Sequence, residues 1–284
     1  MRKKIKKYLP KIIGIQLSSL YLINPKKATK KAYYLFCSPR RGRIKPEQKD
    51  FLNTAKKEVL TIQQTPIQTY HWEGSGNTVL LIHGWESNTH RWKELITELQ
   101  EKNFNIIAFD APAHGNSGGK IINIPIYANI ADVLVKKFTP DYLVGHSMGG
   151  MTSVYYQHFF TENTIKKTVL LGAPSELDRI MYGYQKILNL NNKFMADLEQ
   201  IFVRKFNFRF KEFSVANFAK TIQNPTLIIH DQYDKIVPLT EAEKIKQNLK
   251  DVELLITEGA GHSLNNQMIN QKITRFLLNH KHHE

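Results

Sequence analysis

A serine between two glycines, in the segment Gly145-His146-Ser147-Met148-Gly149, is the strongest chemical feature of this sequence. The segment follows a short apolar run and precedes a stretch with the pattern of a helix. Glycines two residues before and after the serine suit a sharp turn from strand to helix, because side chains there would obstruct the turn. Such a turn exposes the serine oxygen, which can then attack an acyl carbon as a nucleophile. It also directs the amide N–H of Met148 toward a developing oxyanion.

Acidic and basic partners for this serine follow later in the chain. Asp231 and Asp234 come after an apolar run that predicts a buried strand, and His262 lies in a glycine-rich segment after another predicted strand. A serine hydroxyl is a poor nucleophile, so an imidazole must accept its proton and later return it to the leaving group. A carboxylate on the far ring nitrogen fixes the tautomer and stabilises the imidazolium. The residue types therefore predict a triad in which Ser147 is the nucleophile and His262 the base.

A further segment, His83-Gly84-Trp85, ends an early apolar strand. With it, residues 66 to about 280 closely resemble the α/β-hydrolase superfamily, whose triad runs in the order serine, acid, histidine. The sequence is most similar to a bacterial esterase-like branch with His-Gly-Trp and Gly-His-Ser-Met-Gly motifs. This resemblance implies an α/β-hydrolase fold, with a mostly parallel central sheet, helices on both faces and a small helical lid. It also implies a serine hydrolase, since the related dehalogenases and epoxide hydrolases carry aspartate at the nucleophile position.

The resemblance assigns the acid of the triad to Asp234. The family places its acid four residues before the proline of an Asp-x-x-Val-Pro motif, and the sequence from Asp234 to Pro238 matches that motif. Asp231 is the competing candidate, because triads are defined by geometry and not by spacing. The alternative role for Asp231 is a cap at the end of its strand.

The resemblance also assigns the oxyanion hole to the backbone N–H groups of Trp85 and Met148. The Trp85 side chain is then free to line the pocket, although a plain core aromatic is the alternative. Asp110 begins a loop in which it is expected to serve as scaffold, and His114 of that loop is a weaker candidate for the pocket. The residues expected to support the elbow and its neighbouring loops are His83, Gly84, Asp110, Gly145, His146 and Gly149.

The composition excludes several other classes of protein. The 284 residues, 42% of them hydrophobic, are enough for one large core, and no stretch approaches the roughly 20 apolar residues of a transmembrane helix. The single cysteine, Cys37, cannot form an internal disulfide and favours a reducing compartment. The sequence contains no Cys/His ligand cluster, so we expect no metal and no cofactor, and we interpret His280, His282 and His283 as a solvated tail.

The net charge of +15 is concentrated at the start of the chain. Residues 1–50 hold fifteen lysine or arginine residues and two acidic residues, a net +13. A nearly neutral remainder argues against nucleic-acid binding by the hydrolase-like part. Residues 1–24 could be a secretory signal, an amphipathic helix on anionic membrane, or a helix that packs its apolar stripe on the catalytic body. We favour the packed helix, with cytoplasmic localisation and peripheral contact with the inner membrane surface as a further option.

Short apolar runs alternate with amphipathic segments through the rest of the chain, which is typical of a parallel sheet covered by helices. We expect a basic, mainly helical extension at residues 1–65 and a hydrolase domain at 66–284. About fifty residues without a good sheet strand predict a lid insertion at about 174–221. Predicted strands cover 67–72, 78–83, 105–110, 142–145, 168–171, 225–230 and 252–257, and predicted helices cover 91–101, 126–137, 148–160, 240–250 and 265–279.

These features predict a serine hydrolase that cleaves a small-molecule carboxylic ester with a small or medium apolar acyl group. The insertion suggests that acyl group, because it is rich in phenylalanine and tyrosine, with an extended segment expected at residues 206–210; the rings could equally serve as packing. A thioesterase, a carbon–carbon bond hydrolase or an acyltransferase would use the same triad. A ligand-binding receptor with a vestigial triad is the non-enzymatic alternative. The sequence determines neither the physiological substrate nor the oligomeric state.

Overall fold

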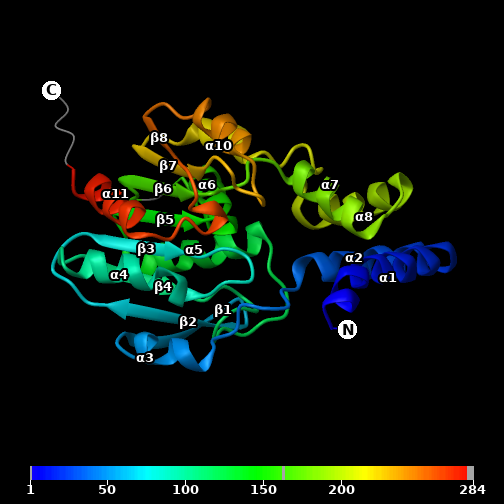
Figure 1. The fold of residues 1–284 in the computed structure, drawn as a ribbon, viewed down its shortest axis with the longest axis horizontal. Coiled ribbons are helices and arrows are strands. Elements are labelled where there is room, and N and C mark those ends of the chain that lie inside the picture. Colours follow the sequence, from blue (N-terminus) through cyan, green and yellow to red (C-terminus); the bar gives the residue numbers. More distant parts are fainter. Residues whose placement is uncertain (1, 162–163, 280–284) are drawn as a thin grey trace. The chain divides into compact units, whose positions relative to one another are not determined.

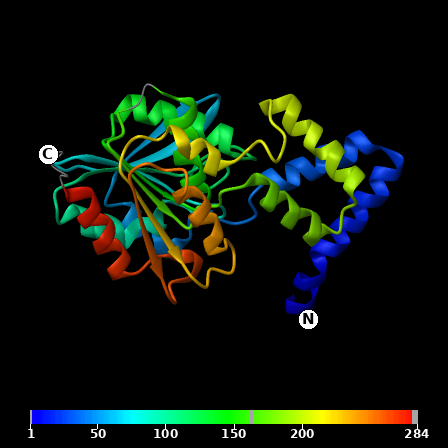
Figure 2. The ribbon, with the colours of Figure 1, turned by 90° about the horizontal axis from the view of Figure 1, so that it is seen from above.

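The computed structural model describes residues 2–161 and 164–279, and the chain divides into two compact units. One unit combines residues 1–38 with residues 176–214, and we call it the helical unit. The other combines residues 39–175 with residues 215–284, and we call it the body. Both are drawn in Figure 1 and Figure 2. The expected C-terminal tail with His280, His282 and His283 lies outside the described residues.

The body is built on an eight-stranded sheet. Its strands are β1 (Lys56–Ile62), β2 (Thr65–Trp72), β3 (Thr78–Ile82), β4 (Asn105–Phe109), β5 (Tyr142–His146), β6 (Lys167–Leu171), β7 (Thr226–Asp231) and β8 (Val252–Thr257). They are ordered β1-β2-β4-β3-β5-β6-β7-β8. β1 and β2 are antiparallel to their neighbours, and every pairing from β4 to β8 is parallel. The predicted mostly parallel sheet is confirmed.

Helices cover both faces of the sheet, as the alternation of side chains along β3 requires. Val79 and Leu81 belong to one buried cluster with residues of α4 (Lys93–Gln100) and α11 (Gln267–Leu278). Leu80 and Ile82 belong to a second cluster with residues of α5 (Ile124–Phe138) and α6 (Met148–Phe159). The remaining short elements of the body are η1 (Pro46–Gln48), α3 (Lys49–Leu52), η2 (Thr89–Trp92), α9 (Val215–Phe218), η3 (Ala219–Thr221), α10 (Leu239–Lys246) and η4 (Gly261–Ser263).

The edge strand β1 was not among the predicted strands, and it changes the boundary of the N-terminal extension. Lys56 to Ile62 pairs along its whole length with β2, so residues 39–65 belong to the body and not to a helical extension that ends at residue 65. The strand begins with two lysines and a glutamate and is mostly exposed. Charged side chains on an edge strand prevent pairing with other chains, and they also hide the alternation that would reveal the strand.

The helical unit is formed by two segments that lie far apart in the sequence. Helices α1 (Arg2–Ile23) and α2 (Pro25–Cys37) come from the N-terminus, and α7 (Leu177–Leu188) and α8 (Asn192–Phe206) come from the insertion. α1 packs on α7, and α2 packs on α8. The turn between α1 and α2 follows from local chemistry, because the Asn24 side chain accepts a hydrogen bond from the Lys27 amide and Pro25 begins the next helix.

This arrangement gives the apolar stripe of residues 1–24 a partner other than the expected one. The body was the favoured partner for residues 1–24, whereas the buried residues of α1 pack within the helical unit. The Tyr21 hydroxyl donates to Asp197 over 2.6 Å, and the Tyr21 ring lies 4.8 Å from that of Phe194. Gly14 lies so close to α7 that an added Cβ would stand 1.8 Å from the carbonyl oxygen of Leu188.

The predicted insertion at 174–221 is mainly helical, but its phenylalanine segment is not extended. Phe206 is the last residue of α8, and the chain then turns through a left-handed Asn207. The rings of Phe206 and Phe208 stack with centroids 5.7 Å apart, and Phe210 packs edge-on against Phe202 at 5.1 Å. These rings therefore pack against one another inside the helical unit, which agrees with the packing alternative.

Candidate active site

The serine lies at a strained turn between β5 and α6. Ser147 has φ of 52° and ψ of −116°, a left-handed conformation that costs a residue with a side chain roughly 1–3 kcal/mol. The flanking glycines are required by space. A Cβ at Gly145 would lie 2.5 Å from the carbonyl oxygen of Gly149, and one at Gly149 would lie 2.0 Å from that of Ile82. The elbow therefore packs directly on the backbone of β3, as the pattern of small residues predicts.

The structure brings Ser147, His262 and Asp234 into one hydrogen-bonded chain. His262, in η4 just after β8, has its Nε2 3.0 Å from Ser147 Oγ, and its Nδ1 lies 2.7 Å from Asp234 Oδ2. Because a carboxylate can only accept, Nδ1 carries the proton and Nε2 is left to accept from the serine hydroxyl. The Asp234 side chain is fully buried and that of His262 is 21% exposed. This is the geometry of a nucleophile, a base and an orienting acid.

Asp234 is held in place by the backbone of its own loop. Its Oδ1 accepts hydrogen bonds from the amides of Ile236 and Val237 over 2.8 and 3.0 Å, which leaves Oδ2 directed at His262. His230 approaches the same carboxylate to 3.7 Å, but its Nε2 bonds to the carbonyl oxygen of Val237. The aspartate is therefore oriented before any substrate binds.

Asp231, the competing acid, has a structural role. Its carboxylate accepts from the amides of Tyr233 and Ala260 and from the hydroxyl of Thr257, over 2.8 to 3.1 Å. Burial acts to raise the pKa of Asp231, but the hydrogen bonds from Ala260, Tyr233 and Thr257 outweigh it and hold that pKa below its ordinary value. These contacts join the end of β7 to the loop that carries His262. They agree with the alternative role predicted for Asp231, a cap at the end of its strand.

The proposed oxyanion donors belong to two segments that meet at Ser147. Met148 is the first residue of α6, where helix geometry leaves the amide N–H without an intrahelical acceptor. The loop after β3 reaches the elbow at Gly84, where an added Cβ would lie 3.0 Å from Ser147 Cβ. Trp85 follows directly, and its side chain is 38% exposed, which excludes the plain core aromatic.

Two buried histidines hold that loop in place. His83 accepts from the Ala111 amide through Nε2 over 2.9 Å and donates from Nδ1 to the carbonyl oxygen of Gly84 over 2.7 Å. Burial holds the pKa of His83 well below its ordinary value, which is consistent with a neutral ring that bonds only to the backbone. His114 accepts from the Glu86 amide over 3.0 Å and donates to the Pro112 carbonyl oxygen, so it supports the loop.

Asp110 serves as the expected scaffold. Its carboxylate is fully buried and accepts from the Thr89 amide over 2.9 Å, the Asn116 amide over 2.8 Å and the Tyr70 hydroxyl over 2.9 Å. These bonds link the loop after β4 to η2 and to β2. A side chain at Gly115 could not be accommodated, because its Cβ would overlap this carboxylate at 2.0 Å.

Two residues that hold the base were found only in the structure. His146 was expected to support the elbow through its backbone, but its side chain also contacts the carbonyl oxygen of His262 through Nε2 at 2.8 Å. Arg91 had no assigned role, and its Nη2 donates to the carbonyl oxygen of Ser263 over 2.9 Å. Burial lowers the pKa of Arg91 to about 9. Nothing in the sequence distinguishes Arg91 from other arginines, because its partner lies more than 170 positions away.

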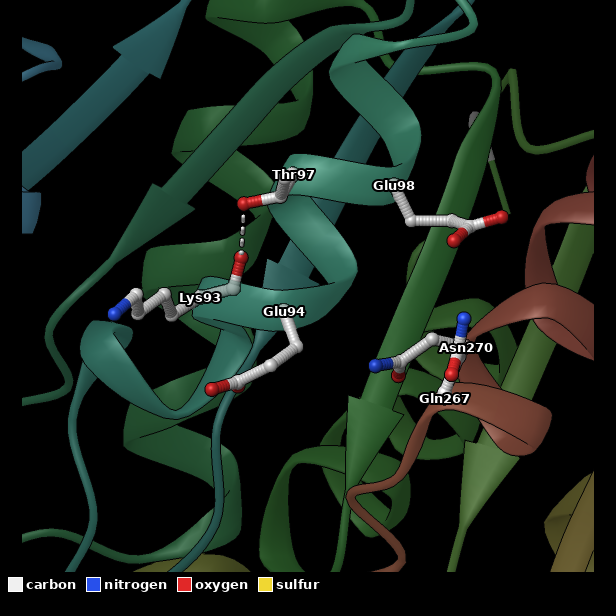
Figure 3. A pocket seen from close by; sticks show the side chains of 6 residues that line it. All are labelled: Lys93, Glu94, Thr97, Glu98, Gln267 and Asn270. Carbon is white, nitrogen blue, oxygen red and sulfur yellow. Dashed lines mark hydrogen bonds between the residues drawn. The ribbon is translucent and has the colours of Figure 1, made fainter.

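A pocket of about 310 Å³ lies elsewhere on the body, between α4 and α11. Glu94 and Glu98 of α4 lie across from Gln267 and Asn270 of α11 (Figure 3). No triad residue lines this pocket, so it is separate from the chemistry described above. Within residues 2–161 and 164–279, no group of three or more histidine, cysteine, aspartate or glutamate side chains is arranged to hold a metal ion.

Comparison with known proteins agrees with this architecture. Residues 77–196 match the family described as alpha/beta hydrolase fold, and residues 211–284 match the family described as TAP-like protein. An AB hydrolase superfamily protein of Bacillus subtilis, YisY, is 25% identical over 72% of this chain and 92% of its own length. The pimeloyl-[acyl-carrier protein] methyl ester esterase of Wigglesworthia glossinidia brevipalpis is 25% identical over 75% of this chain and 98% of its own.

A solved structure shares the fold at lower sequence identity. The esterase EaEST of Exiguobacterium antarcticum superposes with a TM-score of 0.60 over 79% of this chain and 98% of that one, at 18% identity. The strand order, the turn at the serine and the hydrogen-bonded triad thus occur in a chain that is similar to α/β-hydrolases in both sequence and fold.

Proposed function

Because the chain belongs to the α/β-hydrolase superfamily, we propose that it is a serine hydrolase that cleaves a carboxylic ester through an acyl-enzyme intermediate. The observation that carries this proposal is the continuous hydrogen-bonded chain from Ser147 Oγ to His262 Nε2 at 3.0 Å and from His262 Nδ1 to Asp234 at 2.7 Å. A nucleophile, a base within reach of its proton and an acid that fixes the base tautomer are the parts that acyl transfer requires.

The reaction proceeds in two half-reactions. Ser147 Oγ attacks the ester carbonyl carbon while His262 Nε2 takes the hydroxyl proton, and the imidazolium then donates that proton to the departing alkoxide, which leaves as the alcohol. A water molecule attacks the acyl-serine and gives its proton to Nε2. The collapse of the second intermediate releases the carboxylic acid and returns the proton to Ser147 Oγ. Asp234 stabilises the imidazolium in both halves.

The oxyanion of each tetrahedral intermediate is assigned to the amide N–H groups of Met148 and Trp85. The N-terminus of α6 adds the positive end of its helix dipole at the same position. Donors that are fixed before the reaction stabilise the transition state without any cost of reorganisation. The buried histidines at positions 83 and 114 support this role, because they bond to the loop on either side of Trp85.

The acyl group is proposed to be small or medium in size and apolar. In the body, three large side chains beside the proposed machinery are partly or largely exposed, at 38% for Trp85, 60% for Tyr233 and 64% for Ile236. Trp85 supplies an oxyanion amide, and the other two flank Asp234 in the chain. Exposed aromatic and aliphatic groups at these positions favour an apolar substrate over a sugar. The methyl ester esterase relative supports the choice of an oxygen ester.

The test combines turnover with active-site labelling. We expect steady-state hydrolysis of short p-nitrophenyl esters and covalent labelling by a fluorophosphonate probe. Ser147→Ala should abolish both and leave the thermal midpoint nearly unchanged, because the hydroxyl contributes one hydrogen bond in a partly exposed site. Labelling that persists in Ser147→Ala would exclude this serine as the nucleophile.

The same assays separate the alternative functions. A burst of p-nitrophenol followed by almost no turnover would favour a ligand-binding receptor with a vestigial triad. Faster cleavage of matched thiol esters than of oxygen esters would favour a thioesterase. Transfer of the acyl group to an added alcohol in preference to water would favour an acyltransferase. Cleavage of a carbon–carbon bond substrate without ester hydrolysis would favour a carbon–carbon bond hydrolase.

A further inference from the structure

Helix α1 has two apolar faces, and only one of them is occupied. Gly14, Leu17 and Tyr21 are buried and lie on one side of the helix, where Gly14 approaches α7 and Tyr21 contacts α8. On the opposite side, the positions 8, 12, 15, 19 and 22 follow one another at intervals of four and three residues, which places them along a single stripe. This exposed stripe consists of Tyr8, Ile12, Ile15, Ser19 and Leu22.

The stripe is strongly exposed for residues of this type. Tyr8 is 53% exposed, Ile12 47%, Ile15 66% and Leu22 86%, and α1 forms one outer edge of the helical unit (Figure 2). Scattered single apolar residues are normal on a surface, but a continuous row along one helix indicates a surface that contacts something apolar. The sequence alone could not separate this row from the buried one, because the exposed Ile15 and Leu22 are interleaved along the chain with the buried Leu17 and Tyr21.

The charge of the helical unit identifies the kind of partner. Its segments at residues 1–38 and 176–214 hold seventeen lysine or arginine residues and five acidic residues, a net +12, whereas the rest of the chain has a net +3. Residues 1–38 contain no acidic residue. Lysines at positions 3, 4, 6, 7 and 11 lie in the same helix as the exposed stripe. An apolar stripe beside dense positive charge is complementary to a surface that is negatively charged and apolar beneath.

We propose that α1 docks the protein on an anionic lipid bilayer, with its exposed stripe in the interface and the positive charge of the helical unit facing the headgroups. Among the described residues, no helix is both long and apolar enough to span a membrane, so α1 would lie in the plane of the surface. The helical unit fixes α1 as a helix before binding, so binding does not bear the cost of folding it.

The stripe with four-three spacing would also suit a second copy of the chain. Two units of +12 would repel each other, and residues 1–38 contain no acidic residue that could pair with lysines across such an interface.

The experiment is vesicle flotation of the full chain with two vesicle compositions. One contains phosphatidylcholine alone, and the other contains phosphatidylcholine with phosphatidylglycerol. We expect binding at least about tenfold stronger to the anionic vesicles, and weaker binding at high salt. The double variant Ile12→Glu/Ile15→Glu should lose about tenfold or more of this binding, since it places two charges in the apolar stripe. Circular dichroism checks that the variant keeps its helix content.

The matched control replaces two exposed apolar residues on a helix of the body. Met268 and Leu278 on α11 are 50% and 41% exposed, and Met268→Glu/Leu278→Glu adds the same charge without touching α1. This control should float like the unaltered protein. An equal loss of vesicle binding in both double variants would show that net charge alone is responsible. It would overturn the proposal that the exposed stripe of α1 contacts the membrane. Equal binding to neutral and anionic vesicles would overturn the choice of partner.

A second copy of the chain is the remaining occupant, and light scattering tests for it. A dimer in the absence of lipid that dissociates in Ile12→Glu/Ile15→Glu, with no flotation of the unaltered protein, would replace the membrane by a homodimer interface. A monomer that floats only with anionic vesicles supports the proposal. Neither result depends on esterase activity, so failure here leaves the proposed chemistry untouched.

Discussion

His146 donates a hydrogen bond from Nε2 to the backbone carbonyl oxygen of His262 over 2.8 Å, and this bond joins the residue before the nucleophile to the base. A carbonyl oxygen can only accept, so Nε2 carries the proton and Nδ1 is unprotonated. Nδ1 is buried and has no hydrogen-bond partner among the described residues. The two rings lie with centroids 5.0 Å apart. One residue therefore places the serine through its backbone and the base through its side chain.

The loop that His146 holds is also bonded to Asp231 through the Ala260 amide and to Asp234 through His262, but its glycines pack against nothing. Gly259 and Gly261 have φ of 82° and 57°, and a Cβ added at either would meet nothing within 4 Å. The carbonyl oxygens of His262 and Ser263 are held from two different elements, by His146 of the elbow and by Arg91 of η2. We infer that these two side chains restrict a loop whose own sequence favours flexibility.

The first prediction concerns His146 as a positioning residue. His146→Leu removes the bond to the His262 carbonyl and should lower kcat for p-nitrophenyl esters by about 10- to 100-fold, because a displacement of about 1 Å in the base costs that much. KM should change little, since substrate does not contact His146 in this assignment. His146→Gln can still donate an N–H to the carbonyl and should recover part of the loss. Equal kcat in all three proteins would remove the positioning role.

The second prediction distinguishes the two acids. Asp234→Asn should lower kcat by about 10⁴-fold, because an amide facing Nδ1 stabilises the wrong tautomer of His262. Asp231→Asn should instead reduce the free energy of unfolding by about 1–3 kcal/mol, since one of its amide donors loses its acceptor. Its kcat should stay within about tenfold of the unaltered protein. Steady-state kinetics and urea unfolding of both variants measure this, and the reverse pattern would transfer the acid role to Asp231.

The third prediction concerns stability at low pH. Burial holds the pKa values of His83 and His146 well below the ordinary value, whereas the unfolded chain binds these protons near pH 6.5. Below about pH 6.5 the unfolded state therefore binds more protons than the folded state. The contribution of the two histidines to the free energy of unfolding is therefore complete above about pH 6.5. It is lost as the pH decreases below that value, by up to about 1.4 kcal/mol per pH unit for each histidine.

Urea unfolding between pH 7.5 and pH 4.5 measures this dependence. His146→Gln removes one of the two groups, so its free energy of unfolding should fall less steeply with decreasing pH than that of the unaltered protein. An unaltered protein with a flat profile across this range would show that the buried histidines bind protons in the folded state as they do in the unfolded state.

The fourth prediction tests the contact between α1 and α7. Gly14→Ala places a Cβ 1.8 Å from the Leu188 carbonyl oxygen, so the helices must separate, at a cost of about 1–3 kcal/mol. Gly183→Ala is the matched control, since Gly183 lies in α7 and an added Cβ there meets nothing within 4 Å. It should stabilise the helix by about 0.5–1 kcal/mol.

Two optical signals separate the units in this experiment. Trp72, Trp85 and Trp92 all lie in the body, so tryptophan fluorescence follows the body, while far-ultraviolet circular dichroism follows helices of both units. In Gly14→Ala, part of the circular dichroism transition should move to lower urea while the fluorescence transition stays in place. Coincident, unshifted transitions in Gly14→Ala would indicate that the close contact at Gly14 does not stabilise the helical unit.

The sequence by itself determined the layers of the body and the residues of the candidate site. The proposed nucleophile is marked by glycines that the elbow needs for space, the proposed triad residues follow predicted strands, and short apolar runs between amphipathic segments predict a parallel sheet. These features are local, so a short window of sequence contains their physical cause. The same applies to Asn24-Pro25, where a cap and a fixed φ separate two helices.

Only the tertiary structure decided which residues and helices become partners across long distances in the sequence. The motif from Asp234 to Pro238 favoured Asp234 over Asp231 as the acid, and the loop hydrogen bonds direct Asp231 to Ala260 and Asp234 to His262. The bond from His146 to His262 joins residues 116 positions apart. The pairing of α1 with α7 joins the N-terminus to an insertion more than 150 residues away. Hydrophobic burial specifies that a stripe must be covered but not by which segment, and that choice depends on which surfaces the folded chain brings together.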